Sequence, residues 1–122
     1  SLMTPLYKSE EVHNPNIVKV IVDLNNFALY FSRSTIPYVR DNEKLSHYFK
    51  HIGVYAYRKQ ALMEFSEQEI SPLESVEKIE CIRYLEHGKK IKMVVTENLN
   101  FEIDTPSDLA RAQEYLNQQN LI

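Results

Sequence analysis

The chain has few glycines and few cysteines, and each shortage excludes a kind of site. Its 122 residues include only Gly53 and Gly88 as glycines and Cys81 as the single cysteine. Two isolated glycines cannot form the glycine-rich loop that commonly holds a nucleotide phosphate. One cysteine cannot form a disulfide within the chain. The sequence therefore predicts neither a phosphate loop of the usual kind nor an internal disulfide.

Two further absences concern membranes and nucleic acids. No apolar run approaches the ~20 residues that a membrane-spanning helix needs. There is no excess of positive charge, since the formal net charge is -3 and the pI is about 5.8, and nucleic acids and anionic bilayers attract basic surfaces. We therefore expect no nucleic-acid partner and no membrane partner. The absence of a signal peptide and the lone cysteine suit the cytoplasm.

The remaining composition is typical of one compact α/β unit. Hydrophobic residues make up 43% and charged residues 25% of the chain. Segments rich in β-branched residues predict strands at 1–7, 17–23, 27–34 and 91–96, with a tight turn at Asn25 and Asn26. Helical patterns fall at 59–67, at 71–86 and from Pro106 onward. A mixed sheet with flanking helices is the expected architecture.

Residues 51–58 predict the strand around which a site could be built. Alternation along a strand places His51, Gly53, Tyr55 and Tyr57 on one face and apolar residues on the other. The missing side chain at Gly53 leaves a notch between an imidazole and two phenols, where a ligand could approach the backbone. The alternative is a partly buried face whose aromatic rings pack under a helix.

Residues 71–86 carry the clearest helix signals. Ser71 and Glu74 form a capping-box pattern, Pro72 suits the first helical position and Gly88 suits the end. On one continuous helix, Glu80 and Arg83 would fall inside the arc of apolar residues. Charges in an apolar environment need a partner. Either the two form an i,i+3 ion pair or Glu80 serves a ligand.

Asp104 directly precedes Thr105 and Pro106, which begin the last predicted helix. An acid at this place is favoured by the helix dipole alone. The alternative is an oxygen ligand for Mg²⁺, which usually takes one or two protein carboxylates together with phosphate and water.

Taken together, six motifs resemble those of a known family. They are NPNIVKV at 14–20, LYFSRS at 29–34 followed by IPY and Arg40, HIGVYAYR at 51–58, SPLE at 71–74, LEHG at 85–88 and DTP at 104–106. Their order and spacing resemble the 3-deoxy-manno-octulosonate (Kdo) cytidylyltransferases, the CMP-Kdo synthetases of Gram-negative lipopolysaccharide synthesis. The resemblance covers nearly the whole chain, residues 1–122, as the C-terminal half of a Rossmann-like nucleotide-diphospho-sugar transferase.

The resemblance implies an activity for the intact enzyme and different binding sites in its two halves. Such enzymes transfer CMP from CTP to Kdo, release pyrophosphate, use Mg²⁺ and are homodimers. The N-terminal half, with the nucleotide loop and the first metal-binding aspartate, is the part that this chain lacks. The half present here would supply the sugar pocket, the dimer contact and one metal ligand. We therefore expect this chain alone to be inactive.

The resemblance also implies roles for individual residues. Asp104 matches a catalytic position, the second metal ligand. The positions that match contacts to the sugar are Arg33, Arg40, His51, Tyr55 and Glu80.

Cys81 departs from the family pattern, which usually has Gln after the carboxylate matched by Glu80. The departure leaves the exact sugar open. One alternative is therefore a cytidylyltransferase for another acidic sugar, such as a sialic acid. A second alternative, of a different class, is a non-catalytic dimerisation module.

Overall fold

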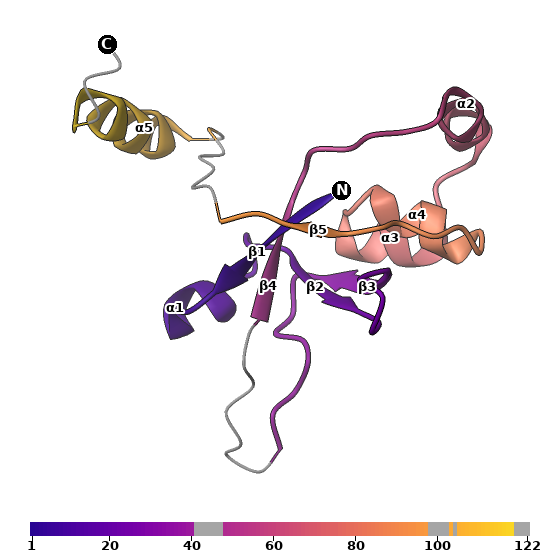
Figure 1. Ribbon diagram of the computed structural model, residues 1–122, viewed down its shortest axis with the longest axis horizontal. Coiled ribbons are helices and arrows are strands. Elements are labelled where there is room, and N and C mark those ends of the chain that lie inside the picture. Colours follow the sequence, from indigo (N-terminus) through magenta and orange to yellow (C-terminus); the bar gives the residue numbers. More distant parts are fainter. Residues whose placement is uncertain (41–47, 98–102, 104, 119–122) are drawn as a thin grey trace.

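The computed structural model describes residues 1–40, 48–97, 103 and 105–118. Within them, one five-stranded mixed sheet has the order β3-β2-β4-β1-β5, and helices flank it (Figure 1). The strands are β1 (Leu2–Leu6), β2 (Lys19–Val22), β3 (Ala28–Ser32), β4 (Tyr48–Ile52) and β5 (Val94–Val95). The helices are α1 (Ser9–Val12), α2 (Lys59–Glu67), α3 (Pro72–Glu77), α4 (Cys81–Glu86) and α5 (Pro106–Gln118). The expected α/β class is confirmed, although α1 lies where a loop was expected.

The sheet is antiparallel except at one edge. β4 pairs with β1 on one side and with β2 on the other, and β2 and β3 form a hairpin. β5 runs parallel to β1. Asn26 adopts a φ of 61° in the hairpin turn, and the carboxylate of Asp23 accepts the backbone N–H groups of Asn25 and Phe27. Asparagine tolerates this left-handed conformation, which is why the turn could be predicted.

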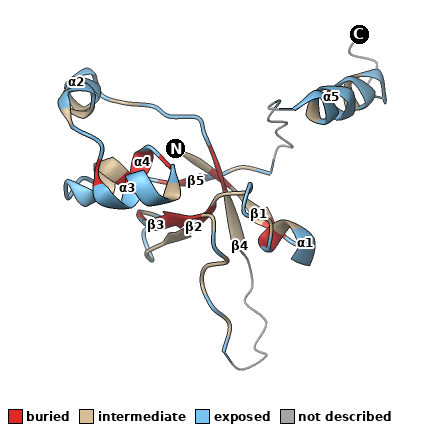
Figure 2. Ribbon diagram, turned by 180° about the vertical axis from the view of Figure 1, so that it is seen from behind, coloured by how far each residue is buried: buried red, intermediate tan, exposed pale blue. Residues whose placement is uncertain are grey.

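The hydrophobic core lies between the sheet and α4. Phe31 from β3 and Ile82 from α4 are both fully buried. Figure 2 shows buried segments in α4 and in the β2–β3 hairpin, and others in α1 and β4. Other buried members are Met3, Val20, Ala28, Ile79, Cys81, Ile91 and Met93. This core fixes α4, and therefore its first residues, against the sheet.

The strand expected over 51–58 ends early, at Ile52. Leu2, the first residue of β1, pairs with Ile52, the last residue of β4. β2 pairs with β4 only at Phe49 and Lys50. Beyond this point β4 has no strand partner among the described residues, and a strand segment without neighbours gains no ladder hydrogen bonds. Residues 53–58 continue as an irregular segment that leads away to α2 (Figure 1). The predicted alternation of faces was wrong beyond Ile52.

The single helix expected over 71–86 is two helices, α3 and α4. Lys78 breaks it with left-handed backbone angles, φ 57° and ψ 45°. The predicted beginning is confirmed, because Ser71 and Glu74 form the capping box and Pro72 opens α3. The end is confirmed as well, since Gly88 has a φ of 71°. The break removes the continuous apolar arc, so Glu80 lies exposed at the N-cap of α4.

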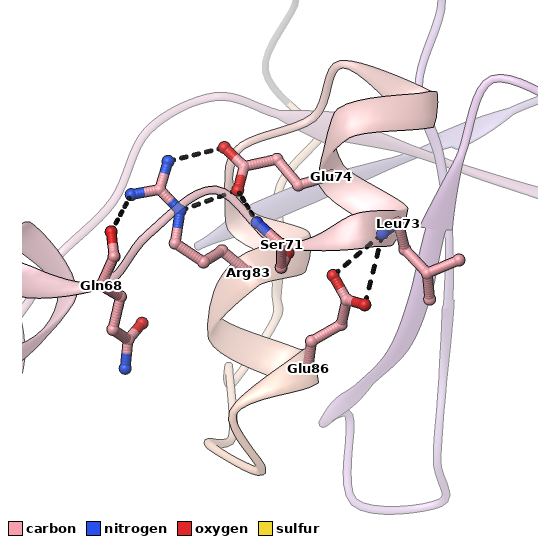
Figure 3. A network of polar contacts seen from close by, with 6 residues as sticks. All are labelled: Gln68, Ser71, Leu73, Glu74, Arg83 and Glu86. Atoms are coloured by element: carbon pink, nitrogen blue, oxygen red, sulfur yellow. Dashed lines mark hydrogen bonds and ion pairs between the residues drawn. The ribbon is translucent and has the colours of Figure 1, made fainter.

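Arg83 forms an ion pair with Glu74 across the two helices (Figure 3). Its Nε and Nη2 donate to the Glu74 carboxylate at 2.7 and 2.6 Å, and its Nη1 donates to the carbonyl of Gln68 at 3.1 Å. The Arg83 guanidinium lowers the pKa of Glu74 below its ordinary value. The expected partner, Glu80, is therefore replaced by an acid nine positions away in the sequence, which the break brings within reach.

Within the described residues, no helix is long and apolar enough to cross a membrane. The longest, α5, has 13 residues.

Candidate functional site

His51 is the buried centre of the candidate site. Its ring lies at the end of β4, 4.8 Å from the ring of Phe31 and 5.5 Å from that of Tyr55, between centroids. Nε2 is 3.0 Å from the hydroxyl oxygen of Ser1. Burial, reinforced by the nearby N-terminal ammonium and Lys50, lowers the pKa of His51 to about 4. The imidazole is therefore neutral near pH 7 and can both donate and accept a hydrogen bond.

Tyr55 and Cys81 form a neutral pair beside this ring. The phenol and the thiol lie near enough for each to affect the pKa of the other. Burial raises the pKa of Tyr55 above its usual range and that of Cys81 to about 11. The negative charge of Glu80 also raises the pKa of Tyr55, so the Glu80 carboxylate is near enough to act on the phenol. This part of the site offers uncharged hydrogen-bonding groups with one carboxylate close by.

Arg33 follows β3 and turns its guanidinium toward backbone carbonyls. Nε donates to the carbonyl of Glu77 at 2.8 Å, Nη1 to that of Pro15 at 3.1 Å and Nη2 to that of Lys78 at 3.4 Å. A guanidinium has five N–H donors. These three bonds therefore leave one N–H on each of Nη1 and Nη2, an arrangement that suits the two oxygens of a carboxylate.

Lys19 is a buried cation that the sequence reasoning missed. Its side chain is fully buried, and Nζ donates to the carbonyls of Asn14, Ile17 and Arg33 at 2.9, 2.7 and 2.5 Å. Burial lowers its pKa, and the charge of Glu77 opposes that shift. The signal was a lone lysine within the apolar run IVKVIV at 17–22, because a charge inside a buried strand requires partners.

The structure brings some of the predicted residues together and separates others. His51 and Tyr55 have their rings in contact, and the charge of Glu80 acts on Tyr55. Arg33 donates to the carbonyl of Lys78, two residues before Glu80. Arg40 is exposed in the irregular segment that follows the cis Ile36–Pro37 bond. Within the described part of the chain, it forms no hydrogen bond or ion pair with the other predicted site residues. These placements leave the assigned roles as predictions.

Asp104 lies outside the described residues, so its predicted role as a metal ligand stays a prediction. Among the residues that the structure does describe, no group of three or more His, Cys, Asp or Glu side chains could hold a metal ion.

Comparison with known proteins gives consistent matches. A family model described as cytidylyltransferase matches residues 1–91. The chain is 57% identical to a 3-deoxy-manno-octulosonate cytidylyltransferase of Christiangramia forsetii, over 95% of this chain and 47% of the relative. It is 53% identical to the Flavobacterium johnsoniae protein of the same name, over 95% and 48%.

A solved structure agrees with these matches. It is that of a CMP:2-keto-3-deoxy-manno-octonic acid synthetase complexed with CTP, with a TM-score of 0.90 and 35% identity. The match covers 98% of this chain and 48% of that one. The chain thus spans about half the length of the relatives and of the solved structure that it matches. With the family model matching most of the sequence, this chain belongs to the cytidylyltransferase family.

Proposed function

We propose that this chain is the sugar-binding half of a CTP:Kdo cytidylyltransferase. The observation that carries the proposal is its 57% identity, over nearly its whole length, to a protein of that name. In the reaction, the anomeric hydroxyl oxygen of Kdo attacks the α-phosphorus of CTP and loses its proton. The bond from that phosphorus to the bridging oxygen breaks, pyrophosphate leaves and CMP-Kdo forms.

The candidate site suits an acidic, hydroxyl-rich sugar. Arg33 has two N–H donors left for the sugar carboxylate, and a charge-assisted pair of this kind is strong and directional. The neutral imidazole of His51 and the phenol of Tyr55 can exchange hydrogen bonds with hydroxyl groups. Glu80 is exposed, and its charge acts on Tyr55, so its carboxylate can accept hydrogen bonds from further hydroxyls. Arg40 is proposed as an additional cation near the sugar acid.

The proposal extends to the metal, the assembly and the location. Mg²⁺, with Asp104 as one ligand, would neutralise triphosphate charge when bound. The other half of the enzyme would supply the nucleotide site and the second acidic ligand. We propose a homodimer acting in the cytoplasm. Support for these points comes from the family resemblance.

The proposal is tested by completing the chain. Residues 1–122 are joined to the part of the Christiangramia forsetii relative that this chain does not match, and pyrophosphate release is measured. We expect turnover that requires CTP, Mg²⁺ and Kdo together and that disappears with EDTA. The 122-residue chain alone should release no pyrophosphate and should not bind CTP in calorimetry.

Two results would contradict the proposal. Robust turnover with a sialic acid and none with Kdo would favour the sibling cytidylyltransferase, an alternative that Cys81 motivates because it replaces the usual Gln. Tight, Mg²⁺-dependent binding of CTP to the 122-residue chain alone would place the nucleotide site within this half.

A further inference from the structure

Glu77, the last residue of α3, is held by the end of β3. One carboxylate oxygen accepts the hydroxyl of Ser32 at 2.6 Å, and the other accepts the backbone N–H of Arg33 at 3.0 Å. The hydroxyl of Tyr30 donates to the first oxygen at the longer distance of 3.5 Å. Because several donors from β3 bind this one carboxylate, they hold the end of the strand against α3.

Arg33, at the same end of β3, also binds the end of α3 with its side chain. Its guanidinium donates to the carbonyls of Glu77 and Lys78, where α3 ends. The last carbonyls of a helix lack partners within the helix and carry partial negative charge, so a cation at this place is favourable. These bonds therefore lie on both sides of Lys78, which adopts a left-handed conformation that is unfavourable for residues with a Cβ atom.

Lys19 joins a third segment to this assembly. Its buried ammonium donates to the Arg33 carbonyl and to two carbonyls of the loop that precedes β2. The negative charge of Glu77 acts on Lys19 and opposes the lowering of its pKa by burial. Two cations and one carboxylate thus form one cluster, in which the backbone carbonyls supply most of the acceptors. We call Lys19, Arg33 and Glu77 the junction cluster.

We propose that the junction cluster positions the sugar site: Glu77 and Lys19 orient Arg33 and fix the break at Lys78, so that α4 begins at Cys81, near Tyr55, with Glu80 as its N-cap. The inference rests on the proposed function for its substrate. Lys19 and Glu77 are positioning residues, since they act through Arg33 and the break. Because three carbonyls already hold the Arg33 guanidinium, its remaining N–H donors have one fixed direction before any sugar arrives.

The first test uses Cys81 as a reporter and needs no activity. Cys81 is the only cysteine in the sequence and is 2% exposed, so its rate of modification by a thiol reagent measures opening of the junction. We expect Glu77→Gln to raise this rate by about tenfold or more, because a charge-assisted hydrogen-bond set is lost. Glu64→Gln is the matched control, since Glu64 pairs with Lys89 on the exposed side of α2 and its loss should leave the rate unchanged.

Low concentrations of urea separate local from global opening. Local opening of the junction exposes little surface, so the rate in Glu77→Gln should depend only weakly on urea, whereas global unfolding has a steep dependence. A rate that rises only in step with the loss of global stability would overturn the inference. So would a rate equal to that of the unsubstituted chain. Should Glu77→Gln not fold, Ser32→Ala removes one bond to the same carboxylate and is expected to act in the same direction.

The second test uses the completed enzyme described above. We expect Glu77→Gln to raise the KM for Kdo by about tenfold or more while the KM for CTP stays close to its original value, and Glu77→Asp to recover part of the loss. Equal changes in both KM values, or none, would overturn the positioning role. If the completed enzyme shows no turnover at all, the proposed function fails, and the thiol measurement still decides whether the cluster fixes the junction.

Discussion

Charges held away from water are the dominant feature of this chain at the scale of single residues: Lys19 is buried, and Arg33 and Arg83 are partly buried. Lys19, Arg33 and Arg83 are cations, and each one donates to backbone carbonyls, to a carboxylate or to both. An unpaired buried charge is costly, and removing one partner of a buried pair usually costs about 3–5 kcal/mol. These residues therefore hold segments together that are far apart in the sequence, rather than merely making the surface polar.

His51 predicts a pH dependence of stability. Its pKa is about 4 in the folded chain and about 6.5 when unfolded. Above pH 6.5 both states are neutral, and the contribution to stability is fully present. Between pH 6.5 and 4 only the unfolded state takes up the proton, so the free energy of unfolding should fall as pH falls, by about 2 kcal/mol at pH 5.

Urea unfolding at pH 7.5 and pH 5 measures this difference. In His51→Gln the loss between the two pH values should shrink by about the same amount, whereas His87→Gln, on an exposed residue, should keep it. Glu74 does not interfere, because Arg83 lowers its pKa below 4.5. An unchanged pH dependence in His51→Gln would show that the imidazole is protonated in the folded chain.

At the scale of elements, the break between α3 and α4 decides where the site residues lie. A continuous helix would carry Glu80 into the apolar arc, while the observed break places it at the N-cap of α4, exposed. The break also lets Arg83 reach Glu74. The polar network in Figure 3 therefore exists because Lys78 adopts a conformation that lysine rarely takes.

The conformation of Lys78 gives a prediction about stability. Glycine adopts left-handed angles without the steric cost of a Cβ atom, so Lys78→Gly should raise the free energy of unfolding by up to about 1 kcal/mol. Lys78→Val should lower it, because a β-branched residue fits this region worst. Chemical denaturation of both variants checks the sign. A destabilising Lys78→Gly would mean that the lysine side chain makes a contribution larger than the strain.

At the scale of the whole molecule, much apolar surface is uncovered. Val76 on α3 is 80% exposed and Leu62 on α2 is 48% exposed. The segment after β4 also exposes Val54. Apolar surface of this extent, together with sheet edges, favours association with another chain. The chain spans about half the length of its relatives.

We expect the 122-residue chain to self-associate. Sedimentation should show a mass that rises with protein concentration toward a dimer or larger species. Leu62→Glu combined with Val76→Glu should lower that association, because charge is costly in a desolvated contact, while Ser9→Glu on the exposed face of α1 should not. A monomer at every concentration would contradict this expectation.

Local signals accounted for the features that depend on neighbouring residues. The hairpin turn at Asn25–Asn26, the capping box of Ser71 and the ending at Gly88 were all predictable, because each depends on the conformational preferences of a few adjacent residues. α2 occupies Lys59–Glu67, as its helical pattern predicted. The motif series also pointed to the cytidylyltransferase family, which the family match confirms.

Tertiary structure alone decided the rest. The extent of β4 depends on which of its residues pair with β1 and β2. The alternation of side chains along β4 itself contains no information about this pairing. The break at Lys78 depends on Arg33 and Glu77, more than forty positions apart, and the partner of Arg83 depends on that break. By itself the sequence determined the α/β class, the turn and helix signals that depend on adjacent residues, and the charges that needed partners. Long-range contacts determined which charged groups pair and which side chains surround His51. The free energy of such contacts cannot be read from any local sequence pattern.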